Sequence, residues 1–164
     1  MSLVSLWVFF PLAITLHNLE EAIWLPKWSK NVKQFHKPIE ANEFYFAVIF
    51  VTILAYLSTF LAIVFPSSWL WKHIFYGFLG AMILNTFVPH IISTIVLRKY
   101  SPGLATGLFL LVPMNSFILY QSVTLGHVKL SDLIISIPVV SFSLLSLLPV
   151  FFKIGGKLAK QMET

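Results

Sequence analysis

The chain contains no cysteine, and only 10% of its 164 residues are charged. The lack of cysteine excludes a disulfide framework, a thiol nucleophile and a thiolate metal site. The scarcity of charge, combined with 58% hydrophobic residues, excludes an ordinary soluble globular domain. The sequence instead contains apolar runs of the length that crosses a bilayer, which is about 18 residues or more.

Five such runs, joined by mostly short connections, lie near residues 2–25, 43–65, 72–97, 104–126 and 131–152. Only the connection 26–42 is long enough for an amphipathic or lid-like segment. The first run has no basic residues before it and contains polar residues, so we expect it to be retained rather than cleaved as a signal peptide. The sequence therefore predicts an all-α integral membrane bundle of five transmembrane helices, forming a single domain over residues 1–164.

The basic residues are distributed unevenly between the connections. Nine of the eleven lie between the first and second runs, between the third and fourth, or after the fifth; Lys72 and Lys129 are the exceptions. The positive-inside rule then predicts a cell-membrane protein with its N-terminus outside and its C-terminus in the cytoplasm. The net charge of +5 is explained by topology and by contact with anionic membrane lipids, so we expect no nucleic-acid partner.

The first run carries an HxxEE cluster formed by His17, Glu20 and Glu21. At ~100° per residue these side chains share one face of a helix, and an ionisable group at membrane depth usually marks function. Two adjacent carboxylates repel each other, so we expect one to be protonated unless a cation lies between them. Alternatively, both extend toward Lys27 and Lys30 at the interface, and His17 makes a hydrogen bond between helices.

The third run brings Asn85 and His90 to the same depth as the cluster, because it crosses in the opposite direction. Pro89 removes the backbone hydrogen bond to the Asn85 carbonyl and is expected to kink or widen the helix. In a regular helix Asn85 and His90 point about 140° apart. A π-type turn would bring them closer, and we therefore treat both as site candidates.

Three further features are weaker candidates. Glu40 and Glu43, at the start of the second run, either lie at the interface or fold back to the site. Asn115 is expected to make a structural hydrogen bond. At the start of the fourth run, Ser101 is interpreted as an N-cap and Gly103 as part of a small-residue packing face. The N–H groups at this helix start offer a weak site for a lipid phosphate.

His17-x-x-Glu20-Glu21 on a first membrane helix resembles the signature of the HXXEE-domain family, small multi-pass proteins of poorly defined function. In that family's pattern the motif is followed by a set of residues that here would be Asn85, His90, Tyr100, Pro102, Gly103 and Thr106. The resemblance spans most of the chain and implies a membrane protein, but no established reaction.

The set of two glutamates, two histidines and an asparagine is also similar to that of the glutamate-type intramembrane proteases, which process prenylated proteins. Their Glu-Glu-x-x-x-Arg pattern is missing here, because residues 22–25 supply no arginine. The similarity therefore concerns the chemistry of the site alone.

Three functions fit these residues. In a metal-dependent hydrolase or oxidoreductase, Zn²⁺ or iron is bound by His17, Glu20, Glu21 and His90, and Asn85 contacts the ligands or the substrate. In a metal-free hydrolase or isomerase, the catalytic acid, base and charge-stabilising groups are Glu20, Glu21, Asn85 and His90. The third function is a non-enzymatic carrier or scaffold. For either enzyme we expect a lipophilic substrate that enters laterally from the inner leaflet; the oligomeric state stays open.

Overall fold

The structure is a computed structural model that describes residues 3–32 and 38–162, and every regular element in these ranges is a helix. In chain order the elements are α1 (Leu3–Trp7), α2 (Phe9–Asn31), α3 (Ala41–Val64), α4 (Trp69–Asn85), η1 (Thr86–Ile91), α5 (Ile92–Leu97), α6 (Leu104–Thr106), η2 (Gly107–Leu111), α7 (Val112–Thr124) and α8 (Leu130–Met162). The elements η1 and η2 are π-helical turns. Five continuous helical segments are long and apolar enough to span a membrane, as predicted.

Two segments run further than the sequence indicated. The first continues to Asn31 through Pro26, and the last continues past residue 152 to Met162. A proline inside a helix removes one hydrogen bond but leaves the neighbouring ones, so it need not end the helix. The predicted connection 26–42 is accordingly shorter, and its residues 33–37 lie outside the described part of the chain.

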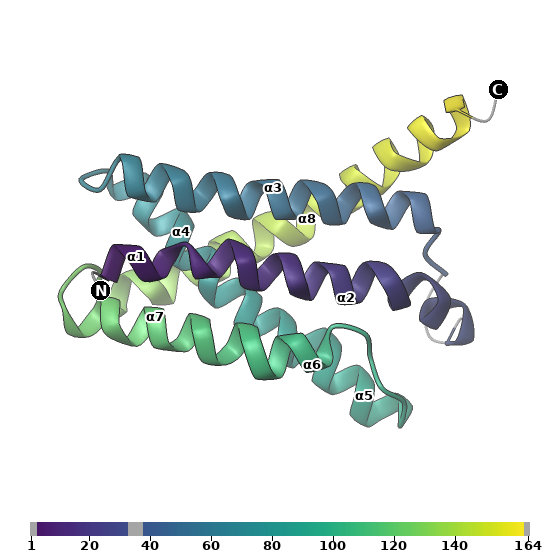
Figure 1. Cartoon of the computed structure of the whole chain (residues 1–164), viewed down its shortest axis with the longest axis horizontal. Helices are drawn as coiled ribbons and strands as arrows, with labels where there is room; N and C mark the ends of the chain where they lie inside the picture. The colour runs from purple at the N-terminus through teal and green to yellow at the C-terminus, as the bar shows by residue number, and fades with distance from the viewer. Residues whose placement is uncertain (1–2, 33–37, 163–164) are drawn as a thin grey trace.

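The helices form a bundle in which α2, α3 and α7 run lengthwise, with α4 and α8 crossing them at an angle (Figure 1). The helix α8 packs mainly on α3 and α4. Small residues allow this approach: a Cβ on Gly77 would lie 2.6 Å from the Ser136 carbonyl oxygen, and one on Gly80 would lie 2.4 Å from the Ile137 side chain. The last turns of α8 extend beyond the other helices (Figure 1).

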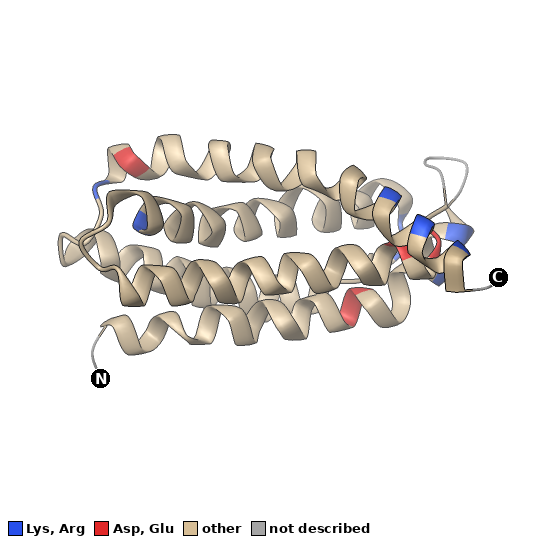
Figure 2. Cartoon of the chain, turned by 90° about the horizontal axis from the view of Figure 1, so that it is seen from above, with Lys and Arg blue, Asp and Glu red and all other residues tan. Residues whose placement is uncertain are grey.

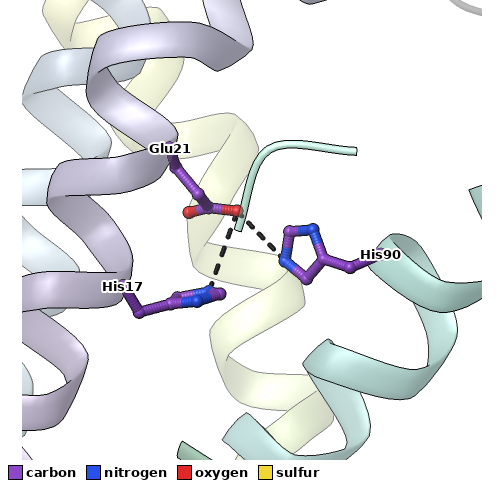
Figure 3. A group of neighbouring side chains, drawn as sticks. All are labelled: His17, Glu21 and His90. Carbon is purple, nitrogen blue, oxygen red and sulfur yellow. Dashed lines mark ion pairs between the residues drawn. The ribbon is translucent and has the colours of Figure 1, made fainter. Parts of the chain in front are cut away.

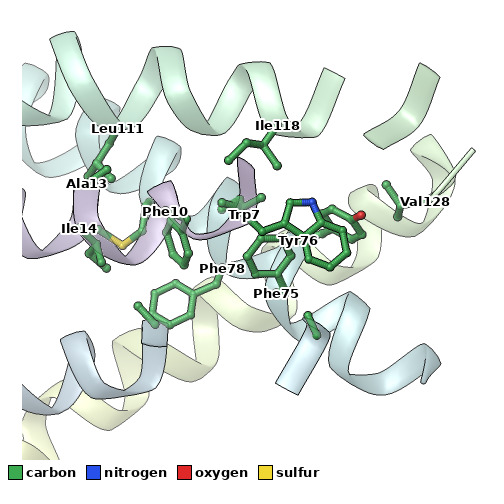
Figure 4. Close-up of a cluster of buried hydrophobic side chains, with 14 of the residues drawn as sticks. Trp7, Phe10, Ala13, Ile14, Phe75, Tyr76, Phe78, Leu111, Ile118 and Val128 are labelled. Carbon is green, nitrogen blue, oxygen red and sulfur yellow. The ribbon is translucent and has the colours of Figure 1, made fainter. Parts of the chain in front are cut away.

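A cluster of buried hydrophobic side chains, several of them aromatic, surrounds Trp7 and Phe10 near the start of the chain (Figure 4). Trp7 packs against Phe75 and Tyr76, and Phe10 against Phe75 and Phe78, with all five side chains at most 2% exposed. Many of the outward-facing residues are also apolar, which suits a lipid environment. The charged residues gather chiefly at the opposite end, where the C-terminus lies (Figure 2).

Candidate metal centre and its supporting network

The π-turn η1 brings Asn85 and His90 together, as the sequence predicted. Pro89 has no N–H for the Asn85 carbonyl, and the π-helical pattern moves the pairing to the residue five positions on, which is His90. Asn85 Nδ2 lies 3.3 Å from His90 Nε2, and the His90 side chain is buried. A regular α-helix would have directed the two side chains apart.

Three side chains from two helices converge beside this turn. On α2, His17 Nε2 lies 3.9 Å from Glu21 Oε1, and the same oxygen lies 3.2 Å from His90 Nε2 on η1 (Figure 3). The three ligand atoms all lie within 4.8 Å of one another. Ligands held at about 2.0–2.1 Å around one tetrahedral ion lie roughly 3.3 Å apart, so this group needs only a small contraction to hold one. His17, Glu21 and His90 therefore fit a divalent metal ion.

The far sides of both imidazole rings contact hydroxyl groups. Thr106 Oγ1 donates a 2.6 Å hydrogen bond to Glu20 Oε2, so its lone pair is available for His17 Nδ1 at 3.1 Å. This arrangement assigns the proton of His17 to Nδ1 and leaves the lone pair of Nε2 facing Glu21. His90 Nδ1 lies 3.5 Å from Ser101 Oγ. Metal-binding histidines are typically oriented in this way, through the ring nitrogen that does not bind the ion.

Asn85 lies beside the same group. Its Nδ2 is 3.5 Å from His17 Nε2 and 3.3 Å from His90 Nε2. The amide can present either its oxygen or its nitrogen to this point by turning about its last bond. Asn85 can thus complete the hydrogen bonding of the imidazoles or contact a ligand bound between them.

Glu20 does not join the three ligands but caps the start of the fourth span. Its Oε1 accepts hydrogen bonds from the Tyr100 hydroxyl and from Gly103 N at 2.9 Å, and its Oε2 accepts one from Thr106 N at 3.0 Å in addition to that from the Thr106 hydroxyl. The anion thereby satisfies backbone N–H groups at a helix start, where negative charge is favoured.

This capping corrects two expectations about the fourth span. The N-terminal residue of α6 is Leu104, preceded by Gly103, and the side chain of Ser101 contacts His90 instead of capping the helix. The N–H groups expected to receive a lipid phosphate are already occupied. Those of Gly103 and Thr106 bond to Glu20, that of Leu104 bonds to the Ser101 carbonyl, and that of Ala105 bonds to the Tyr100 hydroxyl.

The main chain at Gly103 lies directly over the candidate metal centre. Its φ is +92°, which L side chains rarely adopt. A Cβ at this position would lie 2.6 Å from His90 Cε1 and 3.0 Å from both His17 Cε1 and Glu21 Cγ. Two separate constraints therefore favour glycine at position 103. One is the positive φ of the backbone, and the other is the lack of space for a Cβ beside the three ligands.

Tyr100 connects this network with the protein exterior. The residue is 52% exposed, while its hydroxyl donates to Glu20 and accepts from Ala105 N at 3.0 Å. Burial of the hydroxyl, together with its hydrogen bond to the Glu20 carboxylate, raises the pKa of Tyr100. The neutral, hydrogen-bonded phenol is thus the form that the fold stabilises.

Two hollows lie on different sides of α2. A cavity of about 440 Å³ is bounded by α2, α3, α4, η1 and α8, and it has Glu21 and Asn85 in its lining. A more open groove of about 760 Å³ lies between α2 and residues 100–106, and it has Glu20, Lys27 and Tyr100 in its lining. The two adjacent glutamates therefore line different spaces.

The weaker candidates lie away from the centre. Glu40 Oε2 lies 3.8 Å from Lys30 Nζ, both side chains being exposed, and Glu43 packs against Gly156 of α8. Asn115 Nδ2 donates a 3.0 Å hydrogen bond to the Leu79 carbonyl, which confirms its structural role. Neither carboxylate of the HxxEE cluster pairs with a lysine in the described residues.

Sequence reasoning from the residues alone missed Tyr100 and Thr106, which entered only through the family pattern. Their signal was a tyrosine and a threonine close to a proline–glycine pair after the third span, and this pattern is too common to identify a site.

Residues 7–118 match the family described as "Protein of unknown function with HXXEE motif", and this range includes every residue of the centre and its network. The chain is also 52% identical over 151 residues to the Bacillus subtilis (strain 168) protein described as "Uncharacterized protein YrkK", covering 92% of this chain and 96% of that protein. The chain therefore belongs to the HXXEE family. No solved structure matches it.

Proposed function

We propose that this HXXEE protein is a membrane-embedded, metal-dependent hydrolase that acts on a lipid-like substrate. The observation that carries the proposal is the convergence of His17 Nε2, His90 Nε2 and Glu21 Oε1 beside an apolar cavity. Three protein ligands leave a position open for water or substrate, as in catalytic zinc sites. Zn²⁺ and iron both suit a set of two histidines and one carboxylate.

In this proposal the metal supplies Lewis acidity and lowers the pKa of a bound water. The chain supplies orientation and proton transfer. Thr106 and Glu20 keep the proton of His17 on Nδ1. Glu21 Oε2 makes no hydrogen bond within the described residues and is available to accept a proton. The Asn85 amide, at the edge of the cavity, can donate to the oxygen on which charge develops.

The proposal includes the position of the chain in the cell membrane. Most basic residues in the described part lie at one end of the bundle (Figure 2), and the positive-inside rule assigns that end to the cytoplasm. The candidate centre then lies in the cytoplasmic half of the bilayer, within reach of lipids of the inner leaflet.

A metal-free acid–base enzyme is the second candidate, and one observation favours it. Glu21 Oε1 lies 3.2 Å from His90 Nε2, so a protonated Nε2 can donate directly to the carboxylate with no ion between them. A protonated His90 and an ionised Glu21 would serve as acid and base. Metal content distinguishes the two candidates.

The test is metal analysis of protein purified in detergent without chelators. We expect about one Zn²⁺ or iron per chain, because the group offers one set of ligands. Glu21→Gln should weaken binding by roughly 100-fold or more. The matched control is Glu40→Gln, which changes an exposed carboxylate outside the centre and should leave the metal content unchanged.

Hydrolysis of long-chain esters, measured on the same preparations, should follow the metal content. A metal-free preparation that keeps its fold and full activity would overturn the metal-dependent proposal and favour the acid–base enzyme. Variants of His17, Glu21 and His90 that fold and function normally in cells would leave only a structural role for the group.

A further inference from the structure

We infer that the cavity of about 440 Å³ binds the hydrocarbon chain of a neutral, single-chain lipid, with the polar group of that lipid at Glu21 and Asn85. The inference rests on the proposed function for the reaction at that polar group, but the binding of the chain is independent of it. The cavity thereby defines the substrate class.

The cavity has the composition of a binding site for an amphiphile. Its inner wall is formed by the buried residues Phe44 and Ala47 of α3 and Ala81 and Met82 of α4. The facing wall comes from α8 and is apolar apart from Ser141; its other residues include Leu144, Leu148 and Phe152. Pockets that bind small molecules typically combine such apolar walls with a few placed polar groups.

The polar groups of the lining come chiefly from the candidate centre and its surroundings. Glu21 contacts both histidines through Oε1, and Asn85 Nδ2 lies near both of their Nε2 atoms. Asn18 is already engaged, because its Nδ2 donates a 2.7 Å hydrogen bond to Thr52 Oγ1. A chain in the cavity therefore places its functional group beside Glu21 and Asn85.

The rim of the cavity faces the outside of the bundle. Leu84, at the end of α4, is 43% exposed, Val88 of η1 is 56% exposed, and Leu145 of α8 is 63% exposed. These apolar residues are in contact with hydrocarbon if the helices span a bilayer. A lipid can thus enter sideways between η1 and α8 without leaving the apolar phase.

The size and charge of the cavity select the ligand. Ligand pockets range from about 300 to 1,000 Å³, so this cavity is at the lower end and accommodates one chain rather than two. Among the described residues, Glu21 is the single ionisable residue in the lining, and the two histidines that contact it, His17 and His90, lie outside the lining. No lysine or arginine of the described lining is available to pair with an anionic head group, so the expected ligand is an uncharged ester or amide of one long chain.

Photocrosslinking tests the site directly. The probe is a long-chain monoacylglycerol with a diazirine in its chain, added to the full-length protein in nanodiscs, and the labelled residues are mapped by mass spectrometry. We expect labels on the facing walls of the cavity, at Val48 and Val51 of α3 and at Leu144 and Leu148 of α8.

Blocking variants make the test specific. Leu148→Trp fills the cavity and should reduce labelling about tenfold, since excluding a few methylenes from an apolar site has an effect of this size. Its matched control is Leu147→Trp, a neighbour on α8 that is outside the lining and should label as the wild type. Val51→Phe blocks the opposite wall and replaces Leu148→Trp if that variant does not fold.

Several results would overturn the inference. Equal labelling of the blocked and control variants, or labels spread evenly around α8, would mean that the probe binds only as bulk lipid. Equally strong labelling by a diacylglycerol probe would contradict a single-chain site, and stronger labelling by a fatty-acid anion would contradict a neutral one.

The variant His17→Ala separates this inference from the proposed function. It should lose metal and activity but keep its labels, because His17 does not line the cavity. Correct labelling of a wild type that holds no metal would disprove the metal-dependent enzyme and leave the lipid site standing. Metal-dependent hydrolysis of soluble esters without specific labelling would support the metal-dependent enzyme and disprove the lipid site.

Discussion

Glu20 and Glu21 are neighbours on α2, yet their carboxylates have different surroundings. Glu20 accepts four hydrogen bonds, from the Tyr100 hydroxyl, from Gly103 N and from both the N–H and the hydroxyl of Thr106. Within the described residues, the polar contacts of the Glu21 carboxylate are with the imidazole nitrogens of two histidines, and the residue lines the apolar cavity.

The difference shows how one motif provides both support and chemistry. A carboxylate whose oxygens are saturated by donors stabilises the structure around it and has little capacity left for a ligand. A carboxylate with an unused oxygen beside lone-pair-bearing nitrogens can bind a cation or accept a proton. We therefore expect substitutions of Glu20 to affect stability first and those of Glu21 to affect metal binding first.

The largest effect on stability is expected for Glu20→Gln. The amide directs an NH₂ group at N–H or O–H donors, and charge-assisted hydrogen bonds to the start of α6 are lost. The free energy of unfolding should fall by about 2–4 kcal/mol. Reversible unfolding in mixed detergent micelles measures this change.

Glu21→Gln is the matched control for that measurement; in metal-free protein, where loss of the ion does not contribute, it should change the free energy of unfolding by less than about 1 kcal/mol. The proposed difference between the two glutamates is wrong if Glu21→Gln lowers the free energy of unfolding more than Glu20→Gln does. It is also wrong if Glu20→Gln loses the metal while keeping wild-type stability, because Glu20 would then act as a ligand.

An effect of comparable size is expected for Gly103→Ala. The backbone at φ +92° disfavours any side chain, and the methyl group would also press on both imidazoles and on Glu21. The combined cost should be about 3 kcal/mol, of which the backbone accounts for about 1–2. Thermal unfolding measures the combined cost to stability, and metal titration measures the effect of the methyl group on the three ligands.

Gly126→Ala separates these parts, because Gly126 also has a positive φ, of +73°, but its Cβ would meet no atom within 4 Å. We expect Gly126→Ala to lower the free energy of unfolding by the backbone cost alone, about 1–2 kcal/mol, and to leave metal affinity unchanged. Equal effects of the two variants on stability and on metal affinity would show that the contact between Gly103 and the centre contributes nothing.

The smallest effect is expected for Tyr100→Phe, which removes one of the four donors to Glu20 and should cost about 1 kcal/mol near neutral pH. The raised pKa of Tyr100 adds a pH dependence. Above the ordinary tyrosine pKa the unfolded chain loses this proton before the folded chain does, so the wild type should lose stability as the pH rises.

Unfolding experiments at neutral pH and above the ordinary tyrosine pKa measure this dependence. Tyr100→Phe lacks the titrating group, so the stability difference between variant and wild type should narrow at the higher pH. A difference that stays constant or widens would argue against the hydrogen bond from Tyr100 to Glu20.

Much of the fold followed from the sequence because its physical causes are local. Apolar length predicted the five spans, and Pro89 predicted the wide turn that joins Asn85 to His90. The opposite direction of the first and third spans correctly placed these residues at the depth of the HxxEE cluster.

The division of labour between Glu20 and Glu21 could not be predicted in the same way. Helical periodicity places both on the face of His17 but does not say which neighbouring segment each one meets. That depends on the path of residues 98–103, where Arg98 and Gly103 both adopt positive φ values. The contact of Ser101 with His90 depends on the same path. Local sequence therefore predicts a helix cap at Ser101 and misses this contact.

The π-turn at Pro89 has a second consequence, which concerns the path of the chain. An extra residue in one turn changes the direction in which all later side chains of the helix point. Accordingly, α5 has no buried residues, whereas α4 has eight. The helix is steered outward after η1 (Figure 1), and residues 98–103 return in the space thus opened. A single proline therefore directs His90 inward and makes room for the segment whose backbone covers it.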